Sequence, residues 1–304
     1  MNNDEILRRI SELKEEKNAV ILAHNYARAE VQDAADLVGD SFALSLAAVG
    51  TDADMIVFAG VHFMAESAYI LSPQKTVLLP DADAGCPMAD MVTADALRAA
   101  KKNYPDAAVV CYVNSSAAVK AESDVCCTSA NAGEVVEAID KDEILFVPDK
   151  NLGHYISTLT DKKVHLWNGF CPIHQQITAF DVLTAKAKHP NAVFLAHPEC
   201  RPEVLAHADG IFSTAGIIKY AAVSDEKEFI IGTEQEMMHK LMKDSPDKSF
   251  YPVSKYAYCA NMKMATLPSV LNALETETTK ITVPEDIRVK AKKSLDRMLA
   301  AVPK

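Results

Sequence analysis

The feature that most constrains the fold is a pattern of apolar runs and helical stretches that the chain repeats three times in the same order. Each copy begins with a helical stretch, followed by an apolar run that stops abruptly at polar residues. A short connection then ends at a hydroxyl residue, and a second apolar run follows. After another helical stretch, the copy closes with a last apolar run that ends at a cysteine. These three cysteines, Cys86, Cys171 and Cys259, are almost evenly spaced along the chain.

The repeated pattern predicts an α/β fold. Short runs rich in Val, Ile and Leu, separated by helical stretches, are typical of buried parallel strands in βαβ units. A β–α–β rhythm alone would fit any α/β protein, but the polar cluster, the hydroxyl residue and the cysteine fall at matching places in all three copies. We therefore expect three similar βαβ-type lobes with parallel sheets. Lobe 1 covers residues 1–86, lobe 2 covers 87–171 and lobe 3 covers 172–259, and a C-terminal helical extension, 260–304, is expected to pack back on lobe 1.

Charge and hydropathy exclude several classes of protein. The formal net charge of −11 offers no electrostatic footprint for nucleic acid. Residues 1–16 form a charged amphipathic helix rather than a signal peptide, and no apolar run approaches the roughly 18 residues of a membrane span. We therefore expect a soluble, cytoplasmic protein without a nucleic-acid or membrane partner. In that reducing compartment its seven cysteines are better interpreted as free thiols or ligands than as disulfides.

The three recurring cysteines differ in context from the others. Cys86, Cys171 and Cys259 each end a predicted strand and precede a predicted helix, in the segments CPMADM, CPIHQQ and CANMKM. Free N–H groups and the dipole at a helix start stabilise a thiolate, which lowers its pKa and favours metal ligation. The alternative is three ordinary thiols at strand ends. The remaining cysteines are interpreted as structural, and they are Cys111, Cys126, Cys127 and Cys200.

The residues alone leave the metal open. All-thiolate ligation selects zinc or iron–sulfur. Structural zinc usually needs four ligands in paired CxxC spacing, which this chain lacks. Three widely spaced cysteines would leave one iron of a [4Fe–4S] cluster free to act as a Lewis acid. A zinc-dependent lyase or aldolase with three cysteines and water, and a non-catalytic three-lobed binding protein, remain the alternatives.

Polar residues follow the first apolar run of each copy. They are His24, Asn25 and Tyr26 in lobe 1, Tyr112 and Asn114 in lobe 2, and His197 and Glu199 in lobe 3. Ligands of parallel α/β sheets bind beyond the carboxyl ends of the strands, so we expect these groups at one site. There they could hydrogen-bond carboxylates and move protons. Taken singly, each could instead be a structural hydrogen-bonding residue.

Hydroxyl residues at predicted helix starts form the second recurring polar set. Ser41, Ser129 and Thr214 could bind carboxylate or phosphate together with the exposed N–H groups, although helix capping would also explain each of them. Ser213 competes with Thr214 for the third position. His174, three residues after Cys171, is a weaker candidate for a residue beside the metal.

At this point the motifs resemble a known family. The segments run in order from about His24 to Leu267, and they are HNY, GDS, CPMADM, YVNSSAAVKAESDVCCTSAN, PDKNLGHY, GFCPIH, HPEC, ST, GTE and CANMKM. Together they resemble quinolinate synthase. The resemblance implies three similar α/β lobes around a pseudo-three-fold axis. Each lobe would donate one cysteine to a single [4Fe–4S] cluster, here Cys86, Cys171 and Cys259.

The resemblance also implies roles for the polar residues. Tyr26 and Glu199 look like the catalytic groups. The substrate-binding set implied motif by motif is His24, Ser41, Tyr112, Asn114, Ser129, His197, Glu199 and Thr214. Some longer members of the family are similar to a C-x-x-C-x-x-C run at the third cysteine. This chain has Met262 and Ala265 at the corresponding positions, so it resembles the shorter form, without that run's disulfide chemistry.

The activity implied by the resemblance is that of a transferase in NAD biosynthesis. It condenses iminosuccinate (iminoaspartate) with dihydroxyacetone phosphate to give quinolinate, phosphate and water. The expected partners are these small-molecule substrates, with L-aspartate oxidase or aspartate dehydrogenase as the upstream supplier of iminosuccinate.

Overall fold

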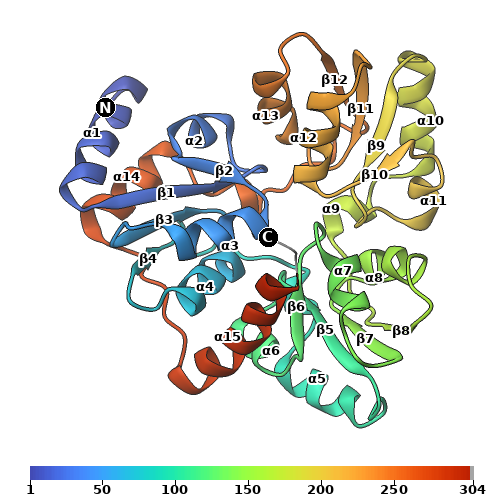
Figure 1. Ribbon diagram of the computed structural model, residues 1–304. Helices are drawn as coiled ribbons and strands as arrows, with labels where there is room; N and C mark the ends of the chain where they lie inside the picture. The colour runs from blue at the N-terminus through green and yellow to red at the C-terminus, as the bar shows by residue number, and fades with distance from the viewer. Residues whose placement is uncertain (302–304) are drawn as a thin grey trace.

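The computed structural model describes residues 1–301, which form three four-stranded parallel sheets, each flanked by helices. Figure 1 shows the three lobes around a common centre, with lobe 1 in blue, lobe 2 in green and lobe 3 in yellow to orange. The predicted α/β fold of three similar lobes is confirmed. Within residues 1–301, no helix is both long and apolar enough to cross a membrane.

Lobe 1 begins with a capped amphipathic helix. Asn2 and Glu5 form a capping box at the start of this helix, which buries Ile6, Ile10 and Leu13. The helices of the lobe are α1 (Asn3–Glu16), α2 (Ala29–Ala34), α3 (Ser41–Gly50) and α4 (His62–Leu71). Its strands are β1 (Ala19–His24), β2 (Leu37–Gly39), β3 (Met55–Ala59) and β4 (Thr76–Leu78). The strand order is β2-β1-β3-β4.

Lobes 2 and 3 repeat this order. The strands of lobe 2 are β5 (Ala108–Tyr112), β6 (Val125–Cys127), β7 (Glu143–Val147) and β8 (Lys163–Leu166), and those of lobe 3 are β9 (Val193–Ala196), β10 (Gly210–Ile211), β11 (Glu228–Gly232) and β12 (Ser249–Pro252). Their orders are β6-β5-β7-β8 and β10-β9-β11-β12. In every lobe the second strand lies outside the first, and the third and fourth follow on the other side.

Helices cover both faces of these two sheets, which explains why their strands are almost continuously apolar. In lobe 2 the helices are η1 (Ala89–Met91), α5 (Ala94–Lys101), α6 (Ala117–Ala121), α7 (Ala132–Glu137) and α8 (Lys150–Ser157). In lobe 3 they are α9 (Pro172–Gln175), α10 (Ala179–Lys188), α11 (Pro202–Leu205), α12 (Thr214–Val223) and α13 (Met237–Asp244).

The C-terminal extension contacts two lobes. It contains η2 (Asn261–Lys263), α14 (Leu267–Thr276) and α15 (Glu285–Ala300). Helix α14 packs on α1 of lobe 1, whereas α15 packs mainly on α6 and β6 of lobe 2 and also touches α4 of lobe 1. The sequence predicted that this extension packs on lobe 1, and the contact between α15 and lobe 2 is additional to that prediction. The residue numbers at which the lobes begin and end stay a prediction.

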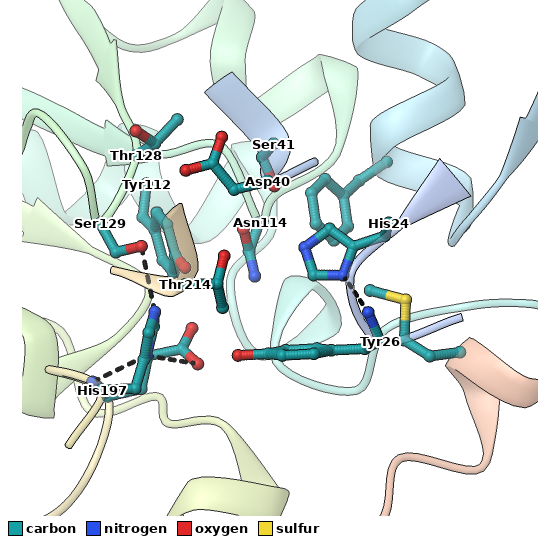
Figure 2. Close-up of a pocket in the computed structure, with 13 residues that line it drawn as sticks. His24, Tyr26, Asp40, Ser41, Tyr112, Asn114, Thr128, Ser129, His197 and Thr214 are labelled. Atoms are coloured by element: carbon teal, nitrogen blue, oxygen red, sulfur yellow. Dashed lines mark hydrogen bonds and ion pairs between the residues drawn. The ribbon is translucent and has the colours of Figure 1, made fainter. Parts of the chain in front are cut away.

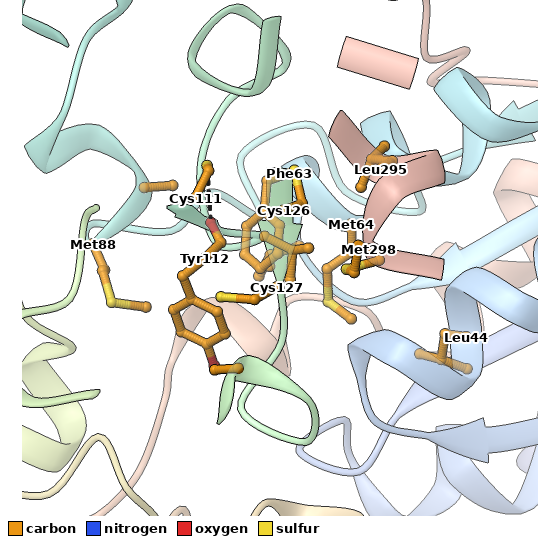
Figure 3. Close-up of a cluster of buried hydrophobic side chains, with 14 of the residues drawn as sticks. Leu44, Phe63, Met64, Met88, Cys111, Tyr112, Cys126, Cys127, Leu295 and Met298 are labelled. Atoms are coloured by element: carbon orange, nitrogen blue, oxygen red, sulfur yellow. Dashed lines mark hydrogen bonds between the residues drawn. The ribbon is translucent and has the colours of Figure 1, made fainter. Parts of the chain in front are cut away.

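The core of lobe 2 is continuous with lobe 1 and with α15. Figure 3 shows Phe63 and Met64 of lobe 1 beside Cys126 of lobe 2 and Leu295 of the last helix, all members of one buried cluster. The four cysteines interpreted as structural are free and buried, and they are Cys111, Cys126, Cys127 and Cys200. Their surroundings are those of packed apolar side chains.

Candidate active site

The polar residues at the strand ends occupy equivalent places in the three lobes. Strand β1 ends at His24 and β5 ends at Tyr112, while His197 directly follows β9. Two residues further along stand Tyr26, Asn114 and Glu199. The sheets therefore present six polar side chains at matching positions of their carboxyl edges, facing the centre of the molecule (Figure 2).

These side chains line one small cavity of about 40 Å³. The structure brings the whole predicted substrate-binding set to this cavity, namely His24, Ser41, Tyr112, Asn114, Ser129, His197, Glu199 and Thr214, together with Tyr26. Four further residues that the sequence did not single out also line it, and they are Asp40, Phe63, Thr128 and Met262. Polar side chains from all three lobes thus line the cavity, with an apolar part that includes Phe63 and Met262.

The hydroxyl residues of the cavity are not the helix caps. Asp40 caps α3 by accepting from the Ala43 N–H at 2.9 Å, so Ser41 is the first residue of that helix. Ser213 caps α12, which makes Thr214 the first helical residue and the one that lines the cavity. Helix capping therefore does not explain why hydroxyl groups stand at these positions.

Other hydrogen bonds hold two of these hydroxyl groups. The Thr214 hydroxyl accepts from the Asn25 side-chain amide at 3.1 Å. Ser129 precedes α7, and its Oγ lies 3.1 Å from His197 Nε2. Each contact joins two lobes, because lobe 1 contacts lobe 3 in the first and lobe 2 contacts lobe 3 in the second.

Both histidines of the cavity are neutral. Burial lowers the pKa of His24 to about 3, with Lys263 adding to the effect. Burial likewise lowers the pKa of His197 to about 3, against the opposing charge of Glu199. The Tyr26 N–H donates to His24 Nδ1 at 3.1 Å, and the Glu199 N–H donates to His197 Nδ1 at 3.3 Å. Because Nδ1 accepts in both rings, the proton of each neutral imidazole is on Nε2, which makes Nε2 a hydrogen-bond donor.

Tyr26 and Glu199 are connected through two other side chains. The Tyr26 hydroxyl lies 2.5 Å from Thr233 Oγ1, which lies 2.8 Å from His174 Nε2. His174 Nδ1 lies 2.8 Å from Glu199 Oε2 and 3.1 Å from Cys171 Sγ. His174, a weaker candidate in the sequence, therefore touches both a catalytic candidate and a cysteine.

The two catalytic candidates have opposite acid–base character. Burial and the Glu199 charge raise the pKa of Tyr26 well above its usual value, so its phenol stays protonated. Burial would raise the pKa of Glu199, but the neighbouring His174, His197 and Tyr112 outweigh burial and hold it below its usual value. Glu199 is thus a carboxylate and Tyr26 a proton donor in the same enclosure.

The three recurring cysteines meet at a second cavity. Cys86, Cys171 and Cys259 line this space of about 90 Å³, and Tyr26 and Glu199 line it as well. Since Tyr26 and Glu199 belong to both cavities, the cysteine cavity and the polar cavity are neighbours with a shared wall. All three lobes contribute one cysteine to this point.

The predicted position of the cysteines at strand ends is wrong in detail. Strand β4 ends at Leu78, β8 at Leu166 and β12 at Pro252, so each cysteine lies on a loop several residues beyond its strand. These three loops bring one thiol from each lobe to the same cavity.

The predicted lowering of the thiol pKa values is also wrong. Burial raises the pKa of Cys86 to about 12, and it raises the pKa values of Cys171 and Cys259 above their usual values. Backbone N–H groups oppose this rise without outweighing it. The helices that follow the cysteines are only three or four residues long, so they supply little dipole.

The surroundings of the thiols fit a metal centre. Each sulfur accepts from backbone N–H groups two or three residues further on, those of Met88 and Ala89, of His174, and of Asn261 and Met262. Hydrogen bonds of this kind to cysteine sulfur tune iron–sulfur clusters. Buried thiols must lose their protons to bind metal, so a bound cation would relieve the unfavourable charge that burial otherwise opposes.

Carboxylates fix two of the three cysteine loops. The Cys171 N–H donates to Asp149 Oδ2 at 3.1 Å, and the Cys259 N–H donates to Glu234 Oε1 at 3.1 Å. Glu234 is in turn paired with buried Lys263, whose Nζ lies 2.7 Å from Glu234 Oε1 and donates to the Tyr26 carbonyl at 2.6 Å. The Cys259 N–H is therefore linked to the Tyr26 carbonyl through Glu234 and Lys263.

A smaller metal site is also geometrically available. Ligand atoms of Cys171, His174 and Glu199 lie within 4.8 Å of one another. His174 Nδ1 and Glu199 Oε2 already contact each other, and a site there would use only one of the three recurring cysteines. The cysteine cavity uses all of them.

Most residues that the sequence reasoning missed lie next to residues that it found. Asp40 stands beside Ser41 in GDS, Thr233 and Glu234 belong to GTE, and Lys263 belongs to CANMKM. These residues could therefore have been found by treating every residue of each motif as a candidate for the site.

Comparisons with known proteins agree with this architecture. The family model described as NadA, Quinolinate synthetase A protein, matches residues 8–300. Quinolinate synthase 2 of Methanosarcina acetivorans is 61% identical over 97% of this chain and 95% of its own. Quinolinate synthase of Methanosarcina barkeri is 59% identical over 99% of both chains, and that of Dehalococcoides mccartyi strain 195 is 54% identical over 98% and 99%. With three lobes that each bring one cysteine to a common polar centre, the chain belongs to the quinolinate synthetase A family.

Proposed function

We propose that this protein is a quinolinate synthase that condenses iminosuccinate with dihydroxyacetone phosphate, giving quinolinate, phosphate and water for NAD biosynthesis. The reaction would make it a transferase. Family membership supports quinolinate synthesis. The main structural support is the shared wall of Tyr26 and Glu199 between a cavity of hydrogen-bond donors and a cavity of three cysteines.

We propose one [4Fe–4S] cluster as the cofactor, held by Cys86, Cys171 and Cys259. When bound, its fourth iron would supply a Lewis acid for a substrate oxygen or nitrogen. The cavity of about 90 Å³ and the N–H groups directed at the three sulfurs support this assignment.

Neutral donors would bind the substrate carboxylates. His24 offers its Nε2–H group, because its Nδ1 is already an acceptor for a backbone N–H. The Nε2–H group of His197 faces Ser129 Oγ, which leaves the Ser129 hydroxyl proton available to a ligand. Hydroxyl and amide groups from all three lobes add further donors, and they are Ser41, Tyr112, Asn114, Ser129 and Thr214. In a buried site such hydrogen bonds to an anion are stronger than in water, so neutral groups suffice.

Tyr26 and Glu199 would move protons. Loss of phosphate from the triose, isomerisation to an aldehyde and the final dehydrations all require proton transfer at carbon or oxygen. Glu199, held as a carboxylate chiefly by His174, would act as the base, and the protonated phenol of Tyr26 as the acid. Enclosure of both groups keeps bulk water from competing for these protons.

The place of the reaction follows from its substrate. Iminosuccinate would come from L-aspartate oxidase or aspartate dehydrogenase, and we propose the cytoplasm as the compartment. The substrates are small molecules, with no role for nucleic acid or membrane.

Anaerobic purification tests the function directly. About four iron and four sulfide per chain, with a broad visible absorbance, are expected together with quinolinate formation from the two substrates. Bound zinc in a colourless protein would indicate a zinc-dependent lyase or aldolase. A protein that binds the substrates without metal and without turnover would be a binding protein, and either result would overturn the proposal.

A further inference from the structure

The carboxyl group of Asp40 in the polar cavity has one oxygen that no proposed role uses. Asp40 is 6% exposed, and its Oδ1 caps α3 through the Ala43 N–H. Its Oδ2 is buried and has no hydrogen-bond partner within residues 1–301. Asp40 lines the cavity, and Figure 2 shows it with Ser41 at the opposite end of the view from Tyr26 and His197.

The equivalent positions in the other lobes show that capping does not need a carboxyl group. The residue directly before the cavity hydroxyl is Asp40 in lobe 1, Thr128 in lobe 2 and Ser213 in lobe 3. Ser213 caps α12 with a single oxygen, in the same way that Asp40 uses Oδ1 for α3. Serine and aspartate are comparable caps. The second carboxyl oxygen of Asp40 is therefore not needed to cap α3.

The chemistry of the cavity indicates what this oxygen would bind. Asp40 and Glu199 are the carboxyl groups among the lining residues, while the histidines, hydroxyls and Asn114 can all donate. Three acceptor oxygens of the lining residues lack partners within residues 1–301, and they are Glu199 Oε1, Asn114 Oδ1 and Asp40 Oδ2. Glu199 is the proposed base and pairs with His174 through Oε2, so Asp40 Oδ2 is the carboxyl oxygen still without an assigned role. No lysine or arginine lines the cavity among the described residues. A substrate carboxylate or phosphate beside Asp40 would meet repulsion, whereas a hydroxyl would donate to it.

We propose that Asp40 is a substrate-binding residue whose Oδ2 accepts a hydrogen bond from the free hydroxyl of the triose phosphate. The inference rests on the proposed function, since dihydroxyacetone phosphate is the proposed substrate that bears a hydroxyl group. Burial raises the pKa of the Asp40 carboxyl, opposed by the N–H groups of Ala43 and Phe42. A donated hydroxyl would give the buried oxygen the partner that the protein does not supply. Asp40 would thus select a hydroxylated triose over a deoxy analogue.

The test compares dihydroxyacetone phosphate with hydroxyacetone phosphate, which carries a methyl group in place of the hydroxymethyl group. Their dissociation constants are measured on the cluster-loaded protein without iminosuccinate. The wild type should bind dihydroxyacetone phosphate roughly 10- to 100-fold more tightly, as expected for a hydrogen bond to a charged group. Asp40→Asn and Asp40→Ser both keep a capping oxygen but lose the carboxylate acceptor, so both should reduce this preference to less than about 3-fold.

Thr93→Ala is the matched control, because Thr93 caps α5 in lobe 2 away from the cavity and its loss should leave the preference intact. Iron content and the thermal midpoint identify variants that have lost the fold. A wild type that binds both ligands equally would overturn the inference without any variant, as would an undiminished preference in folded Asp40→Asn or Asp40→Ser. Failure of the proposed function has a different signature, since the wild type would then form no quinolinate.

Discussion

The centre of the molecule and the core of lobe 2 contain the same unusual residues in different states. Each encloses cysteines, a tyrosine and a buried lysine. In lobe 2, Lys120 donates to the Ser115 carbonyl and lies 5.4 Å from the Phe63 ring centroid, while Cys126 Sγ donates to Ser294 at 3.3 Å. The lobe 2 cysteines are fully buried, whereas Cys86, Cys171 and Cys259 at the centre are only partly buried.

The difference lies in unsatisfied polar atoms and buried charge. At the centre, oxygens of Asp40, Asn114 and Glu199 lack hydrogen-bond partners within residues 1–301, and Lys263 is ion-paired with Glu234. Folded proteins rarely leave buried polar atoms without partners unless a ligand or ordered water completes them. Pairs of variants, one in each region, can therefore test whether the centre is functional and the lobe 2 core is structural.

The largest contrast is expected between two cysteines. Cys171→Ser should lose the cluster, the visible absorbance and all quinolinate synthesis, because one of the three ligands is removed. Cys111→Ser should keep iron, sulfide and turnover, at the cost of reduced stability, since its thiol packs inside strand β5. Iron and sulfide analysis of both variants is the measurement. If Cys111→Ser lost its iron while Cys171→Ser kept it, the assignment of the two cysteines would be reversed.

Next in size is the contrast between two glutamates that each contact a histidine. Glu199→Gln should lower kcat about 10²- to 10⁴-fold, as expected for a proton-transfer group, while the cluster is retained. Glu143 lies 2.7 Å from His165 at the partly exposed edge of lobe 2, and Glu143→Gln should leave kcat within about 2-fold. The measurement is steady-state kinetics, and the iron content of each variant shows whether the cluster is retained. Wild-type turnover in Glu199→Gln would remove Glu199 from the mechanism.

The two buried lysines should differ in their effect on stability. Lys263→Met leaves Glu234 buried without its cation and should lower the free energy of unfolding by about 3–5 kcal/mol. Lys120→Met removes a donor to a carbonyl, with no carboxylate in ion-pair range among the described residues, and should cost about 1–3 kcal/mol. Urea denaturation measures both. Equal losses of unfolding free energy would show that the Lys263–Glu234 ion pair contributes no more to stability than the hydrogen bond of Lys120.

A smaller contrast concerns how the two histidines of the polar cavity affect stability at low pH. The pKa values of His24 and His197 are lowered from 6.5 to about 3, so the unfolded chain binds protons between these limits that the folded protein does not. The free energy of unfolding should therefore fall as the pH decreases from 6.5 towards 3. A His24→Gln/His197→Gln variant should show a shallower fall in metal-free protein, and exposed His154→Gln in lobe 2 should keep the wild-type slope. Identical slopes in all three proteins would contradict the assignment.

The smallest expected effect is in the lobe 2 core. Ser294 Oγ donates towards the carbonyls of Lys120 and Ala291, each at 2.9 Å. Ser294→Ala should lower the free energy of unfolding by about 1 kcal/mol without changing kcat. A change in kcat would show that packing in the core of lobe 2 affects the active site.

The sequence predicted the architecture because its signals were local. The first and third strands of each lobe are mostly buried runs of four to six residues, and their apolar composition identifies them. The second strands β2, β6 and β10 have two or three residues, too few for any recognisable pattern, and were read as connections.

The site was predictable in its members but not in its electrostatics. Recurrence along the chain identified the residues that line the cavities. It could not indicate that Ser213 caps α12 while Thr214 faces the cavity, because the two are adjacent and chemically alike. It also missed the raised pKa of Cys86, since burial depends on how three lobes close around one point.

The contact between α15 and lobe 2 has a consequence for the timing of synthesis. A ribosome delivers the chain from its N-terminus, and domains begin to fold in that order. The strands of lobe 2 are complete long before Ser294, Leu295 and Met298 exist to cover them. A chain interrupted after lobe 3 would therefore expose the apolar surface around Cys126. Lobe 2 thus completes its apolar packing only after α15 has been translated.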